Sequence, residues 1–335
     1  MHASHRIIVI GTSAGGVEAL KELAGALPAD FPAAILVVLH LLRDSPSMLP
    51  HLLSRAGPLP AAHPIDGESI RAGRIYVAPP DLHMVVRQGQ VYLRRGPREN
   101  NSRPAIDPLF RSAAIAYGPA AVGVILTGNL YDGTAGLLSI KAHGGIAIVQ
   151  DPEDAAFRSM PESAIRAVEV DHCLPLAEIP ARLVSIAGRE VATNPKITAR
   201  DPDVVEVTIA EGVPDSLELL KEVAQPSPYT CPECHGALWT ITDERMLRFR
   251  CRVGHAYTAD SLLDLQDQDI ENALWSAVRA LEERAALAKR MVDRTYVLNL
   301  GDVRQRFRTR QEESEHHAGL LRKLLLRGVE KDSQE

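Results

Sequence analysis

The 335-residue chain is 45% hydrophobic and 4% aromatic, and it carries a formal net charge of −6. This length predicts two or three domains with an aliphatic core, and the negative charge argues against a nucleic-acid partner. No apolar run approaches about 18 residues, so no membrane insertion is expected. The polar start, Met1 to Arg6, is unlike a signal peptide, and we therefore expect a cytoplasmic protein.

Over residues 1–190, strand-like apolar runs alternate with stretches that are long enough for helices. The predicted strands are Ile7–Ile10, Ile35–Leu39, Ile75–Ala78, Val122–Leu126 and Ile146–Val149. In Met84–Arg94 the pattern changes, and Gln88-Gly89-Gln90 predicts a hairpin. The alternation predicts an α/β domain with a doubly wound, mostly parallel sheet.

The rest of the chain changes character. Residues 191–228 are rich in proline and short polar residues, which predicts a linker with a strand at Val204–Ile209 and a short helix after Pro214. A small cysteine-bearing module is expected over 229–258. Residues 259–335 predict a helical hairpin or short coiled coil, broken at Asn299–Asp302. Its apolar stripe is expected to pack within the chain, with a homodimer through these helices as the alternative.

A glycine-rich turn follows the first predicted strand. Gly11-Thr12-Ser13-Ala14-Gly15-Gly16 lies between that strand and a predicted helix over Val17–Leu27. The Ser13 hydroxyl is thereby expected at a helix start, beside free backbone N–H groups. Serine enzymes of acyl transfer need this geometry, but phosphate-binding loops use a similar one.

Two more reactive residues follow predicted strands. His40 comes directly after Ile35–Leu39, and Asp132 lies shortly after Val122–Leu126. Functional groups of open α/β sheets gather beyond the carboxyl ends of the strands, so Ser13, His40 and Asp132 are expected at one edge. There they could act as nucleophile, base and orienting carboxylate. Each alone also has an ordinary structural explanation, such as a helix cap, a satisfied histidine or an Asp-Gly turn.

Two other site types match this pattern less well. Gly11–Gly15 fits the nucleophile elbow of α/β-hydrolases, but their chain order is serine, acid, histidine. A dinucleotide site would need glycine at position 13 and an acidic residue at the end of the second strand, where Ser13 and His40 stand.

Further segments complete a pattern that runs in order from residue 6 to about residue 185. They are Pro64–Glu68, Gly73–Pro80, Asp81–Met84, Arg103–Phe110, Leu126–Gly128, Asp132–Gly133, Gly136, Val149–Pro152 and Ser159–Pro161. Together with Ile7–Gly16 and Val37–His40, they resemble the catalytic domain of CheB-type chemotaxis protein-glutamate methylesterases.

The resemblance implies an α/β catalytic domain over residues 1–190 with a triad of Ser13, His40 and Asp132 and no catalytic cofactor. The implied reaction is hydrolysis of glutamyl γ-methyl esters on methyl-accepting chemoreceptors, and deamidation of receptor glutamines is a further activity of the family. The backbone N–H groups of Ala14 and Gly15 are candidates for the oxyanion hole. The alternative is a catalytically weak adaptor or signalling protein on the same scaffold.

The chain departs from the family pattern in three ways. Family members typically carry an N-terminal receiver domain, but here the catalytic strand starts at Ile7, so regulation in cis is not expected and a separate response regulator is left open as a partner. Asn129 stands where methionine is common, three residues before the triad aspartate, and it could alter rate or substrate choice. The last 140 or so residues lie outside the methylesterase domain, which leaves a related signalling receptor open as the substrate.

The cysteine module has metal-ligand spacing. Cys231, Cys234, Cys251 and His255 form a C-x2-C-x16-C-x3-H pattern, which predicts a structural zinc site rather than disulfides. The alternative is a set of free buried cysteines, and His235 is a competitor for the fourth ligand position. The fourth cysteine, Cys173, is predicted to be a buried structural residue. A protein-contact or dimerisation role suits the module better than nucleic-acid binding, because acidic residues dilute its arginines.

Overall fold

The computed structural model describes residues 6–40, 47–189, 191, 201–213, 216–242, 245–297 and 301–329. The chain divides into two compact units, Met1–Leu262 and Leu263–Glu335. Among the helices in these ranges, none combines the length and the apolar character that a membrane span requires.

A seven-stranded parallel sheet forms the centre of the first unit, in the order β10-β9-β8-β1-β2-β5-β3. Its strands are β1 (Ile7–Thr12), β2 (Ala34–Leu39), β3 (Ala61–Ala62), β5 (Ile75–Val77), β8 (Ala121–Ile125), β9 (Ile146–Gln150) and β10 (His172–Leu174). The predicted parallel sheet is confirmed, and its five predicted strands all lie within or overlap these elements.

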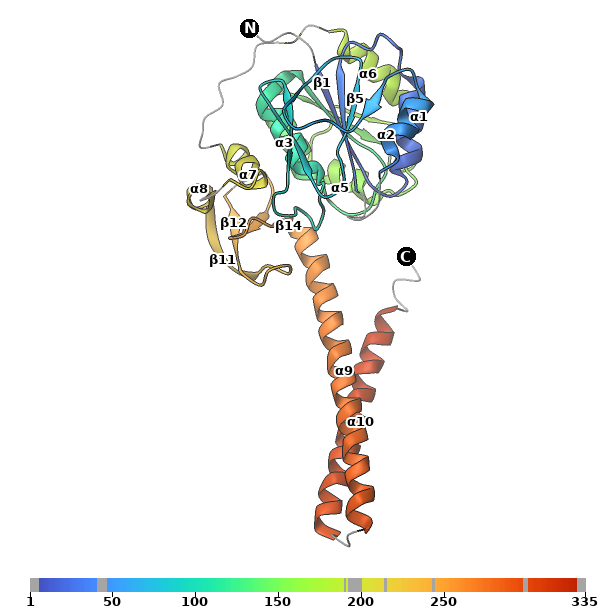
Figure 1. The fold of residues 1–335 in the computed structure, drawn as a ribbon, viewed down its shortest axis with the longest axis vertical. Coiled ribbons are helices and arrows are strands. Elements are labelled where there is room, and N and C mark those ends of the chain that lie inside the picture. Colours follow the sequence, from blue (N-terminus) through green and yellow to red (C-terminus); the bar gives the residue numbers. More distant parts are fainter. Residues whose placement is uncertain are drawn as a thin grey trace. The chain divides into compact units, whose positions relative to one another are not determined.

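Helices cover both faces of this sheet (Figure 1). One face packs against α1 (Gly16–Ala26), α2 (Leu49–Ala56) and α6 (Ile179–Ala187), and the other against α3 (Ile106–Tyr117), α4 (Thr134–Ala142) and α5 (Ser159–Ala167). Short 3-10 turns precede β8 (Gly118–Ala120) and α6 (Leu176–Glu178). Because successive side chains of a strand point to opposite faces, Ile8 joins one core and Val9 the other. Both faces are buried, as a doubly wound sheet requires.

A small antiparallel sheet of β4 (Glu68–Ser69), β7 (Gln90–Arg94) and β6 (His83–Arg87) confirms the predicted hairpin. Gln88 and Gly89 connect β6 to β7 with φ angles of 48° and 76°. Two residues with positive φ are typical of the tight turn that matches the twist of a hairpin.

The strand predicted at Val204–Ile209 is wrong, because these residues belong to the helix α7 (Pro202–Ala210). Asp201 caps the helix by accepting the Asp203 N–H at 2.9 Å, and Pro202 occupies its first turn. These start signals outweigh the strand preference of the β-branched residues that follow.

The predicted short helix after Pro214 is confirmed as α8 (Ser216–Val223). Residues Val205 and Ile209 of α7 share a small core with Leu220 of α8, and α7 also packs on α3. The segment expected to be a linker therefore contributes two packed helices. Residues 192–200 of that segment lie outside the described residues.

The cysteine-bearing module contains a four-stranded antiparallel sheet, ordered β11 (Ala224–Thr230), β12 (Ala237–Ile241), β13 (Arg248–Cys251) and β14 (Ala256–Thr258). We call it the cysteine sheet. Cys173 lies elsewhere, on β10, and its side chain is exposed, so the prediction of a buried residue is wrong. The physical reason is that β10 is the last strand of the parallel sheet, where only one neighbour covers it.

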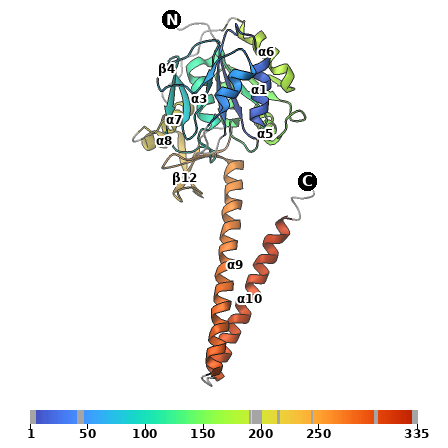
Figure 2. The ribbon, with the colours of Figure 1, turned by 45° about the vertical axis from the view of Figure 1, so that its right-hand side comes forward.

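The C-terminal residues form two long helices, α9 (Ala259–Val297) and α10 (Gly301–Val329), as the sequence predicts. Figure 2 shows these two helices side by side, and Arg322 of α10 donates to Glu282 of α9 at 2.6 Å. Val278 and Ala318 are buried, whereas Leu287 and Leu324 are about 60% exposed. Part of the apolar stripe therefore packs within the chain, and the homodimer through these helices stays a prediction.

Candidate active site and metal cluster

Neighbouring strands β1 and β2 bring Ser13 and His40 to one edge of the parallel sheet. The register of the two strands places Thr12 beside Leu39, and the next residues along are Ser13 and His40. The His40 N–H donates to the Thr12 carbonyl at 3.3 Å. Within the described part of the chain, no hydrogen bond joins the Ser13 hydroxyl to His40. The structure thus places the two residues at adjacent strand ends without joining them.

The segment after β8 holds the Ser13 turn in place. The Ser13 N–H donates to the Thr127 carbonyl at 3.1 Å, and the Thr127 hydroxyl donates to the Ala14 carbonyl at 3.1 Å. Gly128 leaves room for the serine, since a Cβ at that position would lie 2.9 Å from the Ser13 Cβ. Position 128 therefore has to stay without a side chain for Ser13 to keep its place.

Two backbone donors lie at the start of α1. Gly15, with a φ of 75°, directly precedes the helix. The N–H groups of Ala14 and Gly15 donate to no acceptor among the residues that the structure describes, whereas the Ser13 N–H is already used. The arrangement leaves the two predicted oxyanion candidates available at the positive end of the helix.

His40 and Asp132 are hydrogen-bonded, with 2.7 Å between His40 Nε2 and Asp132 Oδ2. The Asp132 carboxylate is buried and also accepts the Ile106 N–H at 2.6 Å, the Asp107 N–H at 3.3 Å and the Asn100 amide at 3.1 Å. Burial acts to raise the pKa of Asp132, but the hydrogen bond and charge of His40 and the backbone and amide donors outweigh it and lower the pKa. Asp132 is thus an ionised partner for the ring, and Nδ1 is the ring nitrogen left to accept a proton.

A second buried carboxyl group, which the sequence reasoning missed, lies beside Asp132. Asp107 accepts the Gly136 N–H at 2.6 Å and the Asn100 amide at 3.0 Å. Burial, followed by the negative charge of Asp132, raises the pKa of Asp107 to about 8. In the sequence this residue resembles an ordinary acidic residue in the first turn of a helix, so no local signal identifies it.

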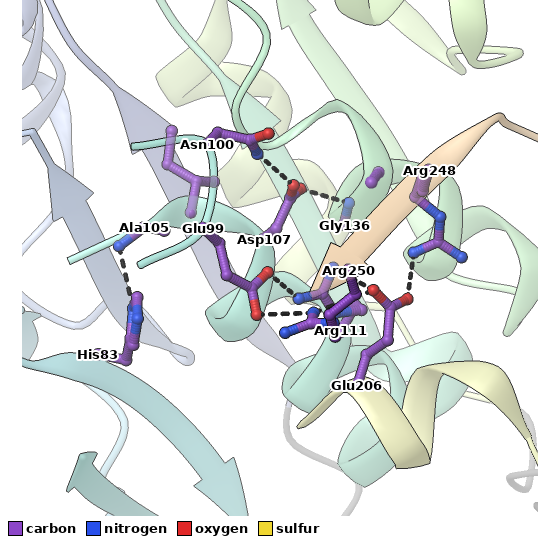
Figure 3. A network of polar contacts seen from close by, with 12 residues as sticks. His83, Glu99, Asn100, Ala105, Asp107, Arg111, Gly136, Glu206, Arg248 and Arg250 are labelled. Atoms are coloured by element: carbon purple, nitrogen blue, oxygen red, sulfur yellow. Dashed lines mark hydrogen bonds and ion pairs between the residues drawn. The ribbon is translucent and has the colours of Figure 1, made fainter. Parts of the chain in front are cut away.

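Five fully buried charged residues form a second polar network nearby, which we call the arginine cluster. It consists of Glu99, Arg111, Glu206, Arg248 and Arg250, drawn in Figure 3. Arg250 Nη2 donates to Glu99 at 2.9 Å and to Glu206 at 3.0 Å. Arg111 pairs with Glu99, and Arg248 pairs with Glu206. These ion pairs attach β13 of the cysteine sheet to α7 and α3.

The two glutamates of the arginine cluster are ionised. Burial acts to raise the pKa of Glu206, but Arg248, Arg111 and Arg250 outweigh it and lower the pKa to about 2. For Glu99, Arg111 and Arg250 likewise outweigh burial and lower the pKa. The cluster therefore consists of fixed charges, two carboxylates paired with three guanidinium groups.

The four predicted metal ligands come together, with Cys251 at the end of β13 and the other three in turns between strands of the cysteine sheet. The ligand atoms of Cys231, Cys234, Cys251 and His255 all lie within 4.8 Å of one another. The Cys234 and Cys251 sulfurs are 3.6 Å apart, and His255 Nδ1 lies 3.5 Å from the Cys251 sulfur. Ligands about 2.3 Å from a tetrahedral ion would be about 3.8 Å apart, so the spacing fits. This cluster could bind a metal ion, and it takes His255 rather than His235 as the fourth member.

Comparisons with known proteins agree with this architecture. The family model of the CheB methylesterase matches residues 8–183. A relative from Leptospira interrogans is 40% identical over 177 residues, which cover 52% of this chain and 92% of the relative. A protein-glutamate methylesterase/protein-glutamine glutaminase from Chromohalobacter salexigens is 38% identical over 189 residues, or 55% of this chain and 53% of the relative.

A solved structure gives the same result for the fold. The crystal structure of the Thermotoga maritima CheB methylesterase catalytic domain superimposes with a TM-score of 0.53 at 36% identity. The match covers 55% of this chain and 100% of that domain. The similarity is therefore to a catalytic domain, and this chain spans about half the length of the Chromohalobacter relative.

Proposed function

This chain belongs to the CheB methylesterase family, and we propose that it hydrolyses glutamyl γ-methyl esters on methylated chemoreceptors or a related signalling receptor. The observation that carries the proposal is the 2.7 Å hydrogen bond between His40 and the buried Asp132, at the sheet edge where Ser13 follows β1. A base oriented by a carboxylate, beside a serine at a helix start, is the arrangement that acyl transfer needs.

In the proposed reaction, Ser13 Oγ attacks the ester carbonyl and His40 Nδ1 takes the serine proton. The N–H groups of Ala14 and Gly15 stabilise the negative oxygen that forms. His40 then donates the proton to the leaving methoxide, which departs as methanol. Asp132 orients the ring and stabilises its charged form, and water finally cleaves the acyl-serine to release the glutamate.

The same acyl chemistry extends to receptor glutamines, where ammonia is the leaving group instead of methanol. The Chromohalobacter relative is named for both activities, which supports glutamine deamidation as a second reaction of this site. The competing function is that of an adaptor, which binds a receptor through the same scaffold without hydrolysing its methyl esters or amides.

Methanol release from methylated receptor membranes tests the proposal. Ser13→Ala is expected to lose at least about 10³-fold in rate, because the nucleophile is removed. Ser185→Ala, an exposed serine on α6, is the matched control and should keep the wild-type rate. Full activity of Ser13→Ala would overturn the triad, and a wild-type protein that binds receptor without methanol release would identify the adaptor.

We also infer that the cysteine cluster holds a structural zinc ion. Three thiolates and one imidazole are a preferred zinc ligand set, and four protein ligands leave no open position for catalysis. None of the steps above uses the ion. Metal analysis of the purified full chain should find one zinc per chain, and Cys234→Ser should lower that content. A metal-free wild-type protein would contradict the inference.

A further inference from the structure

The loop that precedes α3 connects the cysteine sheet to Asp132. The Asn100 N–H donates to the Ala256 carbonyl at 2.8 Å, and the Thr258 N–H donates to Asn100 Oδ1 at 3.1 Å. Both of these partners belong to β14, the strand that begins directly after His255. The other end of the same side chain, Nδ2, donates to Asp132 Oδ1 at 3.1 Å. One residue is thus bonded to the cysteine sheet and to the carboxylate that holds His40.

We propose that Asn100 is a positioning residue for Asp132 and that β14 of the cysteine sheet holds Asn100 in place. Binding of a metal by the cysteine sheet would thereby support the geometry of the esterase site. Asn100 acts through Asp132 and does not contact substrate. The proposal rests on the proposed function for its kinetic readout, whereas its spectroscopic readout is independent of any substrate.

The backbone of the loop is built for this contact. Asn100 and Asn101 have φ angles of 47° and 60°, in the left-handed region that asparagine tolerates better than most residues. Glu99 and Ser102 close the turn through two backbone hydrogen bonds of 3.2 and 2.9 Å. The turn directs the Asn100 side chain into the protein, where it is 7% exposed, and leaves Asn101 exposed.

The adjacent residues fasten the loop to the cysteine sheet. Glu99 accepts a hydrogen bond from Arg250 of β13 at 2.9 Å (Figure 3). Gly254, in the turn between β13 and β14, lies so close to the loop that a Cβ there would be 2.7 Å from Pro97 Cγ. Because the loop is held at three successive points, a shift of the cysteine sheet would move Asn100 with it.

The chemistry of the Asn100 amide suits its place. Its Nδ2 donates to two carboxyl groups, those of Asp132 and Asp107, and adds no charge to either. With Oδ1 of Asp132 held by this donor, Oδ2 stays directed at His40. Without the donor, Oδ1 would keep only the longer hydrogen bond from the Asp107 N–H at 3.3 Å, and the carboxylate would be held less firmly in the orientation that faces the ring.

Asn100→Gly in the full chain is the first test, with Asn101→Gly as the matched control. Glycine adopts the left-handed conformation at both positions, so the backbone is preserved and only a side chain is lost. We expect Asn100→Gly to lower kcat about 10- to 100-fold, as loss of a hydrogen bond to a charged group does, with KM within about twofold. The low-field proton resonance of the His40–Asp132 hydrogen bond should shift or broaden. Asn101→Gly should change neither.

Equal kcat values and an unchanged resonance in the two variants would overturn the proposal. If the wild type released no methanol, the proposed function would fail, and the resonance alone would decide whether Asn100 positions Asp132. The two failures are therefore distinguishable.

Asn100→Asp distinguishes the hydrogen bond that Asn100 accepts from Thr258 from the one that it donates to Asp132. The variant keeps an oxygen for the Thr258 N–H but replaces the donor by an anionic oxygen that faces Asp132 and Asp107. We expect a larger loss of kcat than in Asn100→Gly. The acid limb of the kcat/KM profile should also move to higher pH, because the added negative charge favours the protonated base. Among the described residues, the other charged groups near this site are His83, which interacts with Asp132, and Arg111 and Glu99, which interact with Asp107, and the variant retains all three. An unmoved acid limb would contradict a direct action on the His40–Asp132 pair.

A double-mutant cycle tests the link to the cysteine sheet. Cys234→Ser, placed in the wild-type and in the Asn100→Gly background, is checked for zinc content and thermal unfolding of the full chain. If β14 acts through Asn100, Cys234→Ser lowers kcat in the wild-type background and adds less than about twofold in the Asn100→Gly background. Losses that multiply would show that the two sites act independently, and no loss in either background would show that the sheet does not support the site.

Discussion

Two buried polar networks meet in one loop, because Glu99 belongs to the arginine cluster and its neighbour Asn100 binds Asp132. In the arginine cluster, each carboxylate is paired with guanidinium groups of fixed charge. Around Asp132, the partners besides His40 are neutral N–H groups of the backbone and of an amide. The difference teaches that a carboxylate serving a base whose charge changes is held by neutral donors, whereas a purely structural one is neutralised by arginine.

The titration of the two networks differs in the same way. The arginines lower the pKa of Glu206 to about 2. In the other network, burial and the charge of Asp132 raise the pKa of Asp107 to about 8. The first carboxyl group stays ionised well below its ordinary pKa of 4.5, and the second holds a proton near neutral pH.

The largest effect, on kcat, is expected at Asp132, the carboxylate that is hydrogen-bonded to His40. Asp132→Asn removes the charge that orients His40 and stabilises its protonated form, and kcat should fall about 10⁴-fold. The thermal unfolding temperature should also fall, because the amide nitrogen that replaces one carboxylate oxygen cannot accept the buried hydrogen bonds which that oxygen receives. Methanol release and calorimetry measure the two quantities. A loss of stability with intact kcat would place Asp132 among the structural carboxylates.

The opposite result is expected in the arginine cluster. Glu206→Gln leaves Arg248 and Arg250 short of a buried partner, which should lower the free energy of unfolding by about 3–5 kcal/mol. The kcat of the folded protein should stay within a few-fold of wild type. Urea unfolding measures the change, and Glu22→Gln, an exposed position on α1, is the control. A stable but inactive Glu206→Gln would break the division between the two networks.

Much of this arrangement follows from local sequence signals. Apolar runs identify β1, β2 and β8, and the rule that functional groups follow parallel strands selects Ser13, His40 and Asp132. The arginine cluster has no such signal, because Glu99 and Arg250 are 151 residues apart and separately resemble surface charges. Only the packing of α7 and β13 on α3 shows that these charges are buried.

Asn100 and the helix α7 illustrate two other limits of sequence reasoning. Asn100 resembles an ordinary turn residue, since its function depends on β14, which lies 156 or more residues later along the chain. In α7, the run of valine, threonine and isoleucine favours a strand, and the Asp201-Pro202 cap decides otherwise. A capping signal of two residues therefore carried more information than the composition of the segment.

The pH dependence of stability should have opposite slopes in the two networks. Glu206 has a lowered pKa, so it stabilises the fold above its ordinary value of 4.5, and this contribution is lost as the pH falls toward about 2. Asp107 has a raised pKa, so stability falls as the pH rises from 3.8 through about 8. In unfolding free energies measured between pH 3 and pH 8, Glu206→Gln should weaken the loss of stability below pH 4.5, where Glu99 and Asp132 still contribute. Asp107→Asn should weaken the fall in stability between pH 3.8 and pH 8. Unchanged slopes would contradict the assigned charge states.

The smallest effect is expected on the Ser13 side of the site, where an exposed side chain would contact the substrate. Phe157 is 44% exposed, and its Cδ2 would lie 3.3 Å from a Cβ at Gly15, beside the Ser13 turn. An exposed aromatic ring at this place suits contact with the receptor rather than the fold. Phe157→Ala should raise KM about 3- to 10-fold with kcat nearly unchanged, because such a contact is made equally in the ground and transition states.

Ile65→Ala provides the control for this measurement, because Ile65 is 76% exposed and is not part of the described site. If Phe157→Ala instead lowered kcat at constant KM, the ring would contribute to the geometry of Ser13, and the Ser13 turn would resemble the Asp132 network in being held by its surroundings. An effect on KM alone would distinguish the two parts of the site. The His40–Asp132 pair would then depend on buried hydrogen-bond donors, whereas the Ser13 side would depend on an exposed apolar surface for binding the receptor.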